Sequence, residues 1–345
     1  MDKSIQADQI WKAMEERTLL DVRTPAEYTK GHIPGALSFP LFENQERVEI
    51  GTLYKQQSPR DAFLRGLELV GPKMADFVRK AEAIAPDKKL LLHCWRGGQR
   101  SGSMGWLLRS AGFDVRTLDG GYKAYRRFVH ASFDQKNTSF IVLGGLTGCG
   151  KTDILHALRD VGHQVIDLEG IARHKGSAFG ALGEQPQPTV EQFENDLYEC
   201  CRNFEAGKPI WLENESKSIG RVYLPEGFWQ NMKRAPVINI ELPFERRLDI
   251  LVDNYGAYPK EDLIEAFNRI RKRLGGQHLK AALEALQEGD LRSAAAIALR
   301  YYDKSYHFFL ERSQVTELIP FKLDAHEPIQ TAHRLIKFYE KRFSA

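Results

Sequence analysis

Short apolar runs alternate with amphipathic stretches along the first 130 residues of the chain. Four runs, at 18–23, 36–40, 89–94 and 114–120, have the nearly continuous apolar character of strands that are buried on both faces. The stretches DAFLRGLELVG, ADFVRKAEAIA and RSGSMGWLLRSAG carry the period of amphipathic helices. This pattern predicts an α/β domain over residues 1–130, in which helices cover both faces of a parallel sheet.

A polar stretch without periodicity, near residues 131–137, separates this half of the chain from the next. Strand-like runs return at 140–144 and within HQVIDLEG, PIWLENES and APVINIELP, with helical stretches between them. From about residue 244 onward the pattern is mostly helical. We therefore expect a second α/β domain over residues 138–345, which ends in a helical extension.

The composition, with 42% apolar and 28% charged residues among 345, is that of a globular protein long enough for two cores. No apolar run approaches the roughly 18 residues that span a membrane. The N-terminal segment lacks the apolar core of a signal peptide, so we expect a cytoplasmic protein that has no membrane partner. A net charge of +3 permits a polyanionic partner but does not require one.

The segment GLTGCGKT, at the end of the apolar run FIVLGG, has the G-x-x-x-x-G-K-[ST] spacing of a phosphate-binding loop. Glycines let successive backbone N–H groups point at one anion, and the lysine adds a positive charge. We expect this loop to bind a polyphosphate, and its threonine is a candidate ligand of Mg²⁺. The predicted phosphate-binding residues are Gly145, Gly148, Gly150, Lys151 and Thr152.

Acidic side chains follow two other strand-like runs of the second half. Glu213 and Glu215 close PIWLENES, where the alternation of an extended strand would place both carboxylates on one side. Asp167 and Glu169 form a similar pair in DLEG, and Arg173 follows in a segment able to meet phosphates. These carboxylates are candidates to hold Mg²⁺ or to orient a nucleophile, and solvated strand-end acids are the alternative interpretation.

A second reactive loop lies in the first half, where HCWRGGQRS places Cys94 directly after a strand-like run and Arg100 six positions later. A cysteine at the start of a helix, close to backbone N–H groups and an arginine, is favoured as the thiolate. Two chemistries use this arrangement, namely hydrolysis of a phosphate ester and transfer of sulfur or selenium on the thiol. The loop alone leaves both open, but a buried inert cysteine would not require its two glycines.

The surrounding sequence resembles a rhodanese domain over residues 5–130. LLDVRTPAEYTKGHIPGALSFP is similar to the opening of that family, with Asp21, Arg23 and Glu27 in its pattern, and TLDGGYKAYRRF is similar to its closing strand. The loop from Cys94 to Arg100 is one residue longer than in common single-domain rhodaneses and matches the related phosphatases. Because a wider loop suits a tetrahedral phosphoryl group, we hypothesise that the thiol meets a phosphate-bearing donor of sulfur or selenium.

The two halves together resemble the tRNA 2-selenouridine synthases over almost the whole chain. The matching segments include HCWRGGQRSGSMGWLL, GLTGCGKT, DLEGIARHKGSAFG, WLENESKSIGRVYLP and LVDNYG. The resemblance implies an enzyme that acts on 2-thiouridine at the wobble position of the tRNAs for Lys, Glu and Gln. It implies geranylation of the sulfur by geranyl diphosphate, then replacement of the S-geranyl group by selenium from selenophosphate. A selenophosphate synthase is a candidate partner.

The same resemblance assigns roles to residues of both halves. It implies that Cys94 receives or steers selenium, that Arg100 holds the phosphate of selenophosphate, and that both are catalytic. The phosphate-binding loop would take the diphosphate of geranyl diphosphate, with no tightly bound cofactor and no metal except Mg²⁺ through Thr152. Further candidate contacts to substrate or metal are Asp167, Arg173, Glu213, Glu215 and Arg221.

A tRNA partner requires basic and aromatic surface, which the helical extension offers in FNRIRKRLGGQHLK and RYYDKSYHFF. Solvated helix faces and aromatic residues of the core are the alternative interpretation of these segments. The candidate tRNA contacts are Arg269, Arg271, Lys272, Arg273 and Tyr302.

Two other functions account for part of these motifs. A cysteine-dependent phosphatase fused to an NTP-dependent kinase explains both loops, but it leaves the rhodanese-like opening without a purpose. A non-catalytic persulfide relay, whose phosphate-binding loop only gates a partner protein, predicts unchanged tRNA nucleosides.

Overall fold

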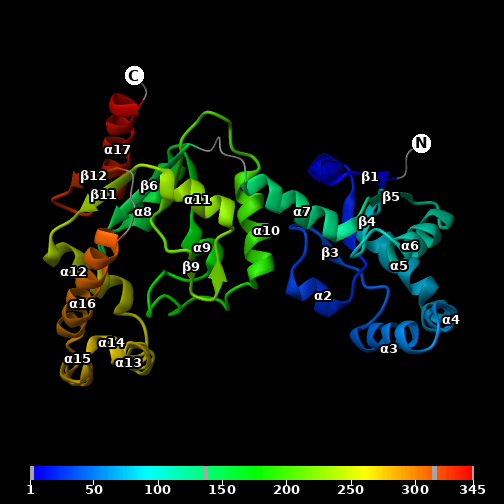
Figure 1. Ribbon diagram of the computed structural model, residues 1–345, viewed down its shortest axis with the longest axis horizontal. Coiled ribbons are helices and arrows are strands. Elements are labelled where there is room, and N and C mark those ends of the chain that lie inside the picture. The colour runs from blue at the N-terminus through cyan, green and yellow to red at the C-terminus, as the bar shows by residue number, and fades with distance from the viewer. Residues whose placement is uncertain (1–3, 135–138, 313–316, 344–345) are drawn as a thin grey trace. The chain divides into compact units, whose positions relative to one another are not determined.

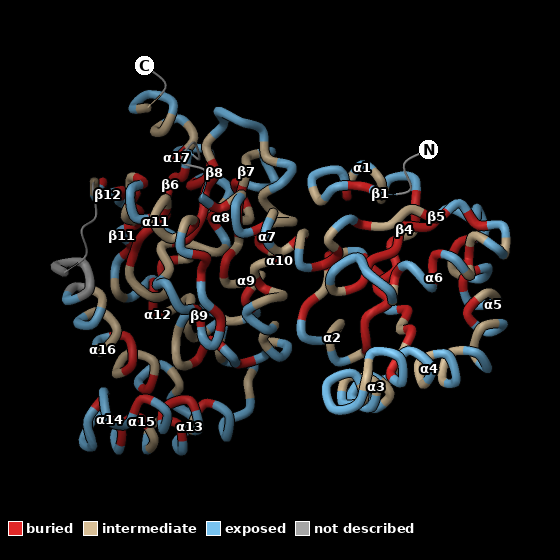
Figure 2. Tube along the Cα trace, turned by 45° about the vertical axis from the view of Figure 1, so that its right-hand side comes forward, coloured by how far each residue is buried: buried red, intermediate tan, exposed pale blue. Residues whose placement is uncertain are grey.

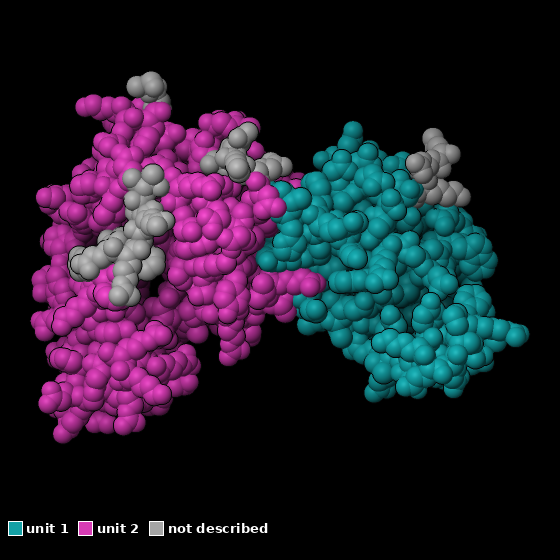
Figure 3. Space-filling view, viewed as in Figure 1, with its two compact units in different colours: residues 1–132, 194–196 teal, residues 133–193, 197–345 magenta. Residues whose placement is uncertain are grey.

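The computed structural model describes residues 4–134, 139–312 and 317–343. Contacts between residues divide the chain into two compact units, residues 1–132 with 194–196 and residues 133–193 with 197–345 (Figure 3). In the described residues each unit contains a five-stranded sheet whose strands all run parallel (Figure 1). The predicted fold class, two α/β domains followed by helices, is confirmed.

The sheet of the first unit has the order β1-β5-β4-β2-β3. Its strands are β1 (Ser4–Ile5), β2 (Thr18–Asp21), β3 (Leu37–Ser38), β4 (Lys89–His93) and β5 (Asp114–Leu118). The central strand β4 buries Leu90, Leu91 and Leu92 completely, since both of its faces are covered (Figure 2). Its apolar run therefore shows no alternation with polar residues.

The helices of the first unit begin at residues suited to capping. Thr24 accepts the backbone N–H of Glu27 at the start of α2, and Ser58 does the same for Asp61 at α4, where a proline follows each cap. The helices are η1 (Ala7–Gln9), α1 (Ile10–Met14), α2 (Pro25–Lys30), α3 (Asn44–Gln56), α4 (Pro59–Val70), η2 (Gly71–Lys73), α5 (Met74–Ile84), α6 (Gln99–Ser110) and α7 (Gly121–Phe133).

The sheet of the second unit has the order β12-β11-β6-β8-β7, with the fully buried β6 at its centre. Its strands are β6 (Phe140–Gly145), β7 (Gln164–Ile166), β8 (Ile210–Glu213), β11 (Val237–Glu241) and β12 (Leu318–Lys322), and a hairpin adds β9 (Ser218–Ile219) and β10 (Val222–Tyr223). The chain is mostly helical after residue 244, as expected, but the edge strand β12 was not predicted. Ile319 and Phe321 face the core while Pro320 lies exposed, as an edge strand allows.

The helices of the second unit form two groups around separate cores. α8 and α17 pack against the sheet, where Leu155, Leu335 and Trp211 share one core. α13, α15 and α16 enclose the other core around Phe267 and Ala282. The helices are α8 (Lys151–Asp160), α9 (Leu168–Ala172), α10 (Val190–Cys201), α11 (Glu226–Arg234), α12 (Phe244–Tyr255), α13 (Lys260–Arg269), α14 (Arg271–Leu274), α15 (Gly276–Glu288), α16 (Leu291–Arg312) and α17 (Pro328–Phe343). Within the described part of the chain, none of the helices is long and apolar enough to cross a membrane.

Candidate active site

The loop that follows β4 places Cys94 at the carboxyl edge of the first sheet, where α/β proteins bind their ligands. The Cys94 side chain is free of any disulfide and only 4% exposed. α6 begins at Gln99, so the loop runs directly into the N-terminus of a helix of twelve residues. The positive end of the helix dipole therefore follows the thiol after a loop of four residues.

Two glycines let the cysteine loop pack against the start of α7. A Cβ atom on Gly97 would lie 2.8 Å from the carbonyl oxygen of Leu118, and a Cβ atom on Gly121 would collide with the carbonyl oxygen of Cys94. The N–H group of Tyr122 donates to that same carbonyl at 2.9 Å. Backbones this close exclude side chains, which explains Gly97 in the first motif and Gly121 in the second.

The electrostatic surroundings of Cys94 favour its thiolate. Burial alone would raise the pKa of the Cys94 thiol, but three other influences lower it below its ordinary value. These are the hydroxyl of Ser101, whose Oγ lies 3.3 Å from the cysteine Sγ, the backbone N–H groups of Arg96 and Ser101, and the charge of Arg100. A thiolate is the nucleophilic form of cysteine. Ser101 was missed by the sequence interpretation.

Arg100 is held by a carboxylate of the first unit. Its Nη1 and Nη2 atoms donate to the two carboxylate oxygens of Glu27, at 2.6 Å and 3.1 Å. Burial would raise the pKa of Glu27, but the hydrogen bond and charge of Arg100 hold it below its usual range. Glu27 also accepts the N–H of Thr24 at 3.1 Å in the cap of α2. Arg100 therefore brings a fixed positive charge to the loop, and Glu27 is a positioning residue.

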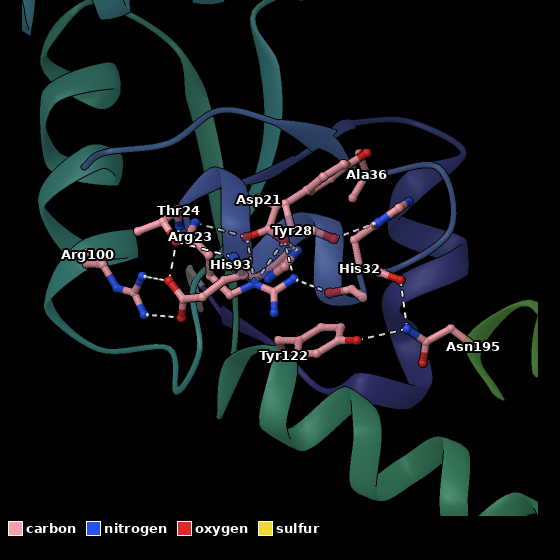
Figure 4. A network of polar contacts seen from close by, with 12 residues as sticks. Asp21, Arg23, Thr24, Tyr28, His32, Ala36, His93, Arg100, Tyr122 and Asn195 are labelled. Carbon is pink, nitrogen blue, oxygen red and sulfur yellow. Dashed lines mark hydrogen bonds and ion pairs between the residues drawn. The ribbon is translucent and has the colours of Figure 1, made fainter. Parts of the chain in front are cut away.

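A buried polar network lies at the carboxyl ends of β2 and β4 (Figure 4). Arg23 and Asp21 form a fully buried ion pair, and the guanidinium also lies 3.8 Å from the ring centroid of Tyr122. His93 lies nearby, with its Nε2 3.7 Å from an Asp21 oxygen. Burial lowers the pKa of His93 to about 4, so its ring is neutral. The Arg23 guanidinium also donates to the carbonyl of Gly31 at 2.7 Å, so the buried pair ties the end of β2 to the end of α2.

The phosphate-binding loop joins β6 to α8 in the second unit. Gly145, Gly148 and Gly150 all have positive φ angles, of 141°, 79° and 74°, which other residues rarely adopt. Lys151 donates from its Nζ to the carbonyl oxygen of Gly145 at 3.0 Å. Burial would lower the pKa of Lys151, but the neighbouring Cys149 and acidic side chains raise it, so the ammonium stays charged.

Three glutamates lie together beside this loop. Thr152 donates to Glu169 at 3.3 Å, and the backbone N–H of Glu169 donates to Glu213 at 2.8 Å. Burial and the charge of Glu169 raise the pKa of Glu215 to about 8, and burial raises that of Glu213 well above its usual value. β8 ends at Glu213, so strand alternation does not position Glu215 as expected. The two carboxylates nevertheless both interact with Glu169, which couples them to Thr152 and Lys151.

Asp167, Arg173 and Arg221 make other contacts. Asp167 caps α9 by accepting the N–H of Gly170 at 2.7 Å, and it also bonds to His156. Arg173 is exposed and donates to a backbone carbonyl in the following loop. Arg221 is exposed in the β9–β10 hairpin. The structure therefore gives Asp167 a structural task and leaves the two arginines on the surface.

A magnesium ion fits this set of residues only together with a substrate. In the parts of the chain described here, no three or more His, Cys, Asp or Glu side chains are arranged to hold a metal. Thr152 and Glu169 offer one hydroxyl and one carboxylate in hydrogen-bond contact. Mg²⁺ commonly binds one or two carboxylates and completes its shell with phosphate oxygens and water.

The candidate tRNA contacts lie in different surroundings. Arg269 pairs with Glu265 on α13, whereas Arg271 and Lys272 are exposed. Arg273 lines a cavity of about 690 Å³. Other residues of this cavity are His278, Arg300, Tyr301 and Lys304, with the acidic Glu245 and Asp303. We call it the basic cavity because its arginine and lysine side chains outnumber its carboxylates.

Tyr302 does not stand on the basic surface, which corrects the expectation that it stacks on a base. Its hydroxyl accepts the N–H of Ala178 at 3.3 Å, and its ring lines a different, apolar cavity. Its neighbour Tyr301 lines the basic cavity instead, together with Phe244. Consecutive residues of a helix point in directions about 100° apart, which accounts for the difference.

Comparison with known proteins gives a match for both halves of the chain. Residues 6–128 match the rhodanese-like domain, and residues 138–334 match the family described as the tRNA 2-selenouridine synthase AAA domain. A tRNA 2-selenouridine synthase of Sulfurovum sp. (strain NBC37-1) is 37% identical over 329 residues, which cover 86% of this chain and 89% of that protein. Those of Chromohalobacter salexigens and Pseudomonas fluorescens are each 36% identical, over 87% and 86% of this chain and 90% and 89% of theirs.

Proposed function

The chain belongs to the tRNA 2-selenouridine synthase family, and on this premise we propose that it converts 2-thiouridine into 2-selenouridine in tRNA. The proposed substrates are the wobble uridines of the tRNAs for Lys, Glu and Gln, geranyl diphosphate and selenophosphate. The observation that carries the proposal is that one chain of this family combines Cys94, whose surroundings lower its pKa, with a glycine-rich loop that holds the charged Lys151.

The first proposed step alkylates the sulfur of the thiouridine. The thiocarbonyl sulfur attacks the first carbon of the geranyl chain, the carbon–oxygen bond breaks, and pyrophosphate leaves with the electron pair while the base loses its N3 proton. Lys151 and the backbone N–H groups of its loop stabilise the departing charge. Mg²⁺ held by Thr152 and Glu169 would supply further neutralisation. The raised pKa of Glu215 keeps that carboxyl protonated near neutral pH, so it does not repel the diphosphate.

The second proposed step exchanges sulfur for selenium. The selenium of selenophosphate attacks C2 of the uracil ring, and the geranyl thiolate leaves with the electron pair of the carbon–sulfur bond. Water then cleaves the phosphorus–selenium bond and releases phosphate. Selenium stays at the selenide oxidation level throughout, so the step needs no oxidant. In this step Cys94 steers the selenium donor and forms no bond to selenium. Arg100, fixed by Glu27, attracts its phosphate group.

The tRNA requires a basic surface with accessible aromatic rings. The cavity lined by Arg273 and Tyr301 combines the two, because guanidinium groups bind phosphates and a ring stacks on an unpaired base. We assign this cavity of α12, α14, α15 and α16 to RNA binding within the proposed function.

Nucleoside analysis tests the proposal directly. Purified protein is incubated with a 2-thiouridine anticodon stem–loop, geranyl diphosphate and selenophosphate, and the products are identified by mass spectrometry. Wild type should form S-geranyl-2-thiouridine and then 2-selenouridine, whereas Cys94→Ser should stop at the geranylated product. Cys200→Ser, in α10, is the matched control and should behave as wild type.

Each remaining outcome has a defined meaning. Absence of both products with wild-type protein would refute the proposed function. Formation of 2-selenouridine by Cys94→Ser would refute the role of that thiol. Turnover of aryl phosphates without any change in the nucleosides would favour the fused phosphatase and kinase.

A further inference from the structure

An apolar cavity lies inside the second unit beside the phosphate-binding loop. Its lining comes from that loop, from α12, α13 and α16, and from Ser177 and Phe179 after α9; it includes Thr147, Leu251, Leu263, Phe267, Ala298 and Tyr302. The cavity has a volume of about 50 Å³, which holds about four groups the size of a water molecule. Its walls are mostly carbon, so a hydrocarbon fits it better than a polar ligand does.

The phosphate-binding loop forms part of the cavity wall. Thr147 belongs to the loop and lines the cavity, and its carbonyl oxygen accepts a hydrogen bond from the buried Arg247 at 3.1 Å. Arg247 is anchored in turn by Asp303, at 2.7 Å and 2.8 Å. A Cβ atom on Gly148 would lie 3.1 Å from Cγ of Leu251, another lining residue. The loop therefore rests on α12, and one of its own residues forms part of the cavity wall.

The chemistry of the walls indicates what kind of group belongs there. No charged side chain is among the described residues that line the cavity. The hydroxyl of Tyr302 already bonds to a backbone N–H, and burial raises the pKa of Tyr255 to about 12, so both phenols are neutral. The cavity's other polar side chains are the hydroxyls of Thr147 and Ser177, and the Ser177 oxygen already accepts the backbone N–H of Phe179 at 3.1 Å. A nucleoside would need several partners for its ribose and its base edge, more than these walls offer. A short branched hydrocarbon needs none.

We propose that the cavity receives the terminal isoprene unit of the prenyl diphosphate whose phosphate groups bind the loop at Lys151. The inference rests on the proposed function and adds the determinant of chain length to it. A geranyl chain has two isoprene units of five carbons each, and room for about four water-sized groups admits no more than one of them. The unit next to the diphosphate would then lie outside the cavity, close to the sulfur that it alkylates.

Ala298 is the position from which the cavity is most simply filled. It lies on α16, it is 8% exposed, and its methyl group is the smallest side chain among the lining residues named above. A leucine there adds three carbons to a space that holds about four water-sized groups. Burial of a whole isoprene unit contributes up to roughly a thousandfold in affinity. A leucine that fills part of the cavity should therefore weaken the binding of geranyl diphosphate. Dimethylallyl diphosphate has only the unit that lies outside the cavity, so its binding should not change.

The test compares chain lengths on one protein. S-alkylation of a 2-thiouridine stem–loop is measured with dimethylallyl, geranyl and farnesyl diphosphates for wild type, Ala298→Leu and Phe267→Ala. We expect Ala298→Leu to lower kcat/KM for geranyl diphosphate by at least about tenfold while that for dimethylallyl diphosphate changes less than about twofold. Phe267→Ala should improve farnesyl relative to geranyl diphosphate. Ala281→Leu makes the same change on the exposed face of α15 and should leave the ratios as in wild type.

The outcomes separate this inference from the proposed function. If wild type alkylates with none of the three diphosphates, the proposed function itself fails. If wild type is active but the variants keep the wild-type ratio of chain-length preferences, the cavity does not hold the chain and the inference is overturned. The affinity of Ala298→Leu for inorganic pyrophosphate, measured by calorimetry, should equal that of wild type. If this variant loses both its affinity for pyrophosphate and its activity with all three prenyl diphosphates, the inference is also overturned.

Discussion

Replacing Ser101 by alanine should raise the pKa of Cys94 and slow the alkylation of this thiol near neutral pH. The Ser101 hydroxyl lies 3.3 Å from the cysteine sulfur, and its hydrogen bond favours the thiolate. A hydrogen bond to a charged group contributes about 1.5–3 kcal/mol, and one pKa unit corresponds to about 1.36 kcal/mol. Because the N–H groups of Arg96 and Ser101 remain in the variant, we expect a rise at the lower end, about one unit.

The sign of the effect follows from the reactive form. Below its pKa, the thiolate fraction of a cysteine falls tenfold for each unit of distance from the pKa. Ser101→Ala should therefore react about tenfold more slowly than wild type at every pH below both pKa values. At high pH, where the thiol is ionised in both proteins, the two rates should converge.

Alkylation by iodoacetamide, followed by peptide mass spectrometry from about pH 5 to about pH 9, measures this shift. Cys94 should react before Cys200, because burial raises the pKa of Cys200 to about 11. Ser103→Ala changes an exposed serine of the same helix and should leave the profile unaltered. An identical pH profile for Ser101→Ala and wild type would refute the assignment of the hydroxyl as a stabiliser of the thiolate.

Three further predictions concern the second unit. Lys151→Met should lower the rate of S-geranylation by about a hundredfold or more, because the departing pyrophosphate loses the positive charge that stabilises it. The affinity for tRNA, measured by filter binding, should not change. Geranylation at the wild-type rate would remove the lysine from the mechanism. Burial and the charge of Glu169 raise the pKa of Glu215 to about 8, above its ordinary 4.5. Between these two pH values the folded protein binds more protons than the unfolded protein. The free energy of unfolding therefore falls as pH rises through this window. Glu215→Gln should make urea midpoints less dependent on pH between about 5 and 8, and an equally steep dependence in the variant would contradict the burial of an ionisable carboxyl there. Arg271→Glu combined with Arg273→Glu should weaken tRNA binding at least about tenfold at low salt and reduce its salt dependence. The control Lys80→Glu makes the same kind of charge change at an exposed position of α5 and should leave binding unchanged. Equal affinities of wild type and the double variant at moderate salt would exclude the two arginines from the RNA surface.

The sequence predicted those strands whose environment is uniform. The middle of β4 and the whole of β6 are buried on both faces, so Leu90–Leu92 and the run from Phe140 show no alternation and are unambiguous. β12 escaped notice because only Ile319 and Phe321 face the core and a proline lies between them. α3 was not predicted either, because none of its thirteen residues is buried and its sequence therefore carries no apolar stripe.

The partners of the reactive residues could not be predicted from spacing. Motif spacing indicated Cys94 and Arg100, but the carboxylate that holds the arginine comes from Glu27, 73 residues earlier in the chain. The same limit applies to α16, where Tyr301 and Tyr302 are equivalent by composition. Only the packing of the helix decides that one lines the basic cavity and the other the apolar one.

The buried pair of Asp21 and Arg23 has a consequence for the evolution of the first unit. Both side chains are almost fully excluded from water, and each is the main partner of the other's charge. Removal of one partner from a buried ion pair costs about 3–5 kcal/mol, a large part of the roughly 5–15 kcal/mol that stabilises a domain. Single substitutions at either position are therefore expected to be purged, and a lineage can replace the pair by apolar residues only through two nearly simultaneous changes.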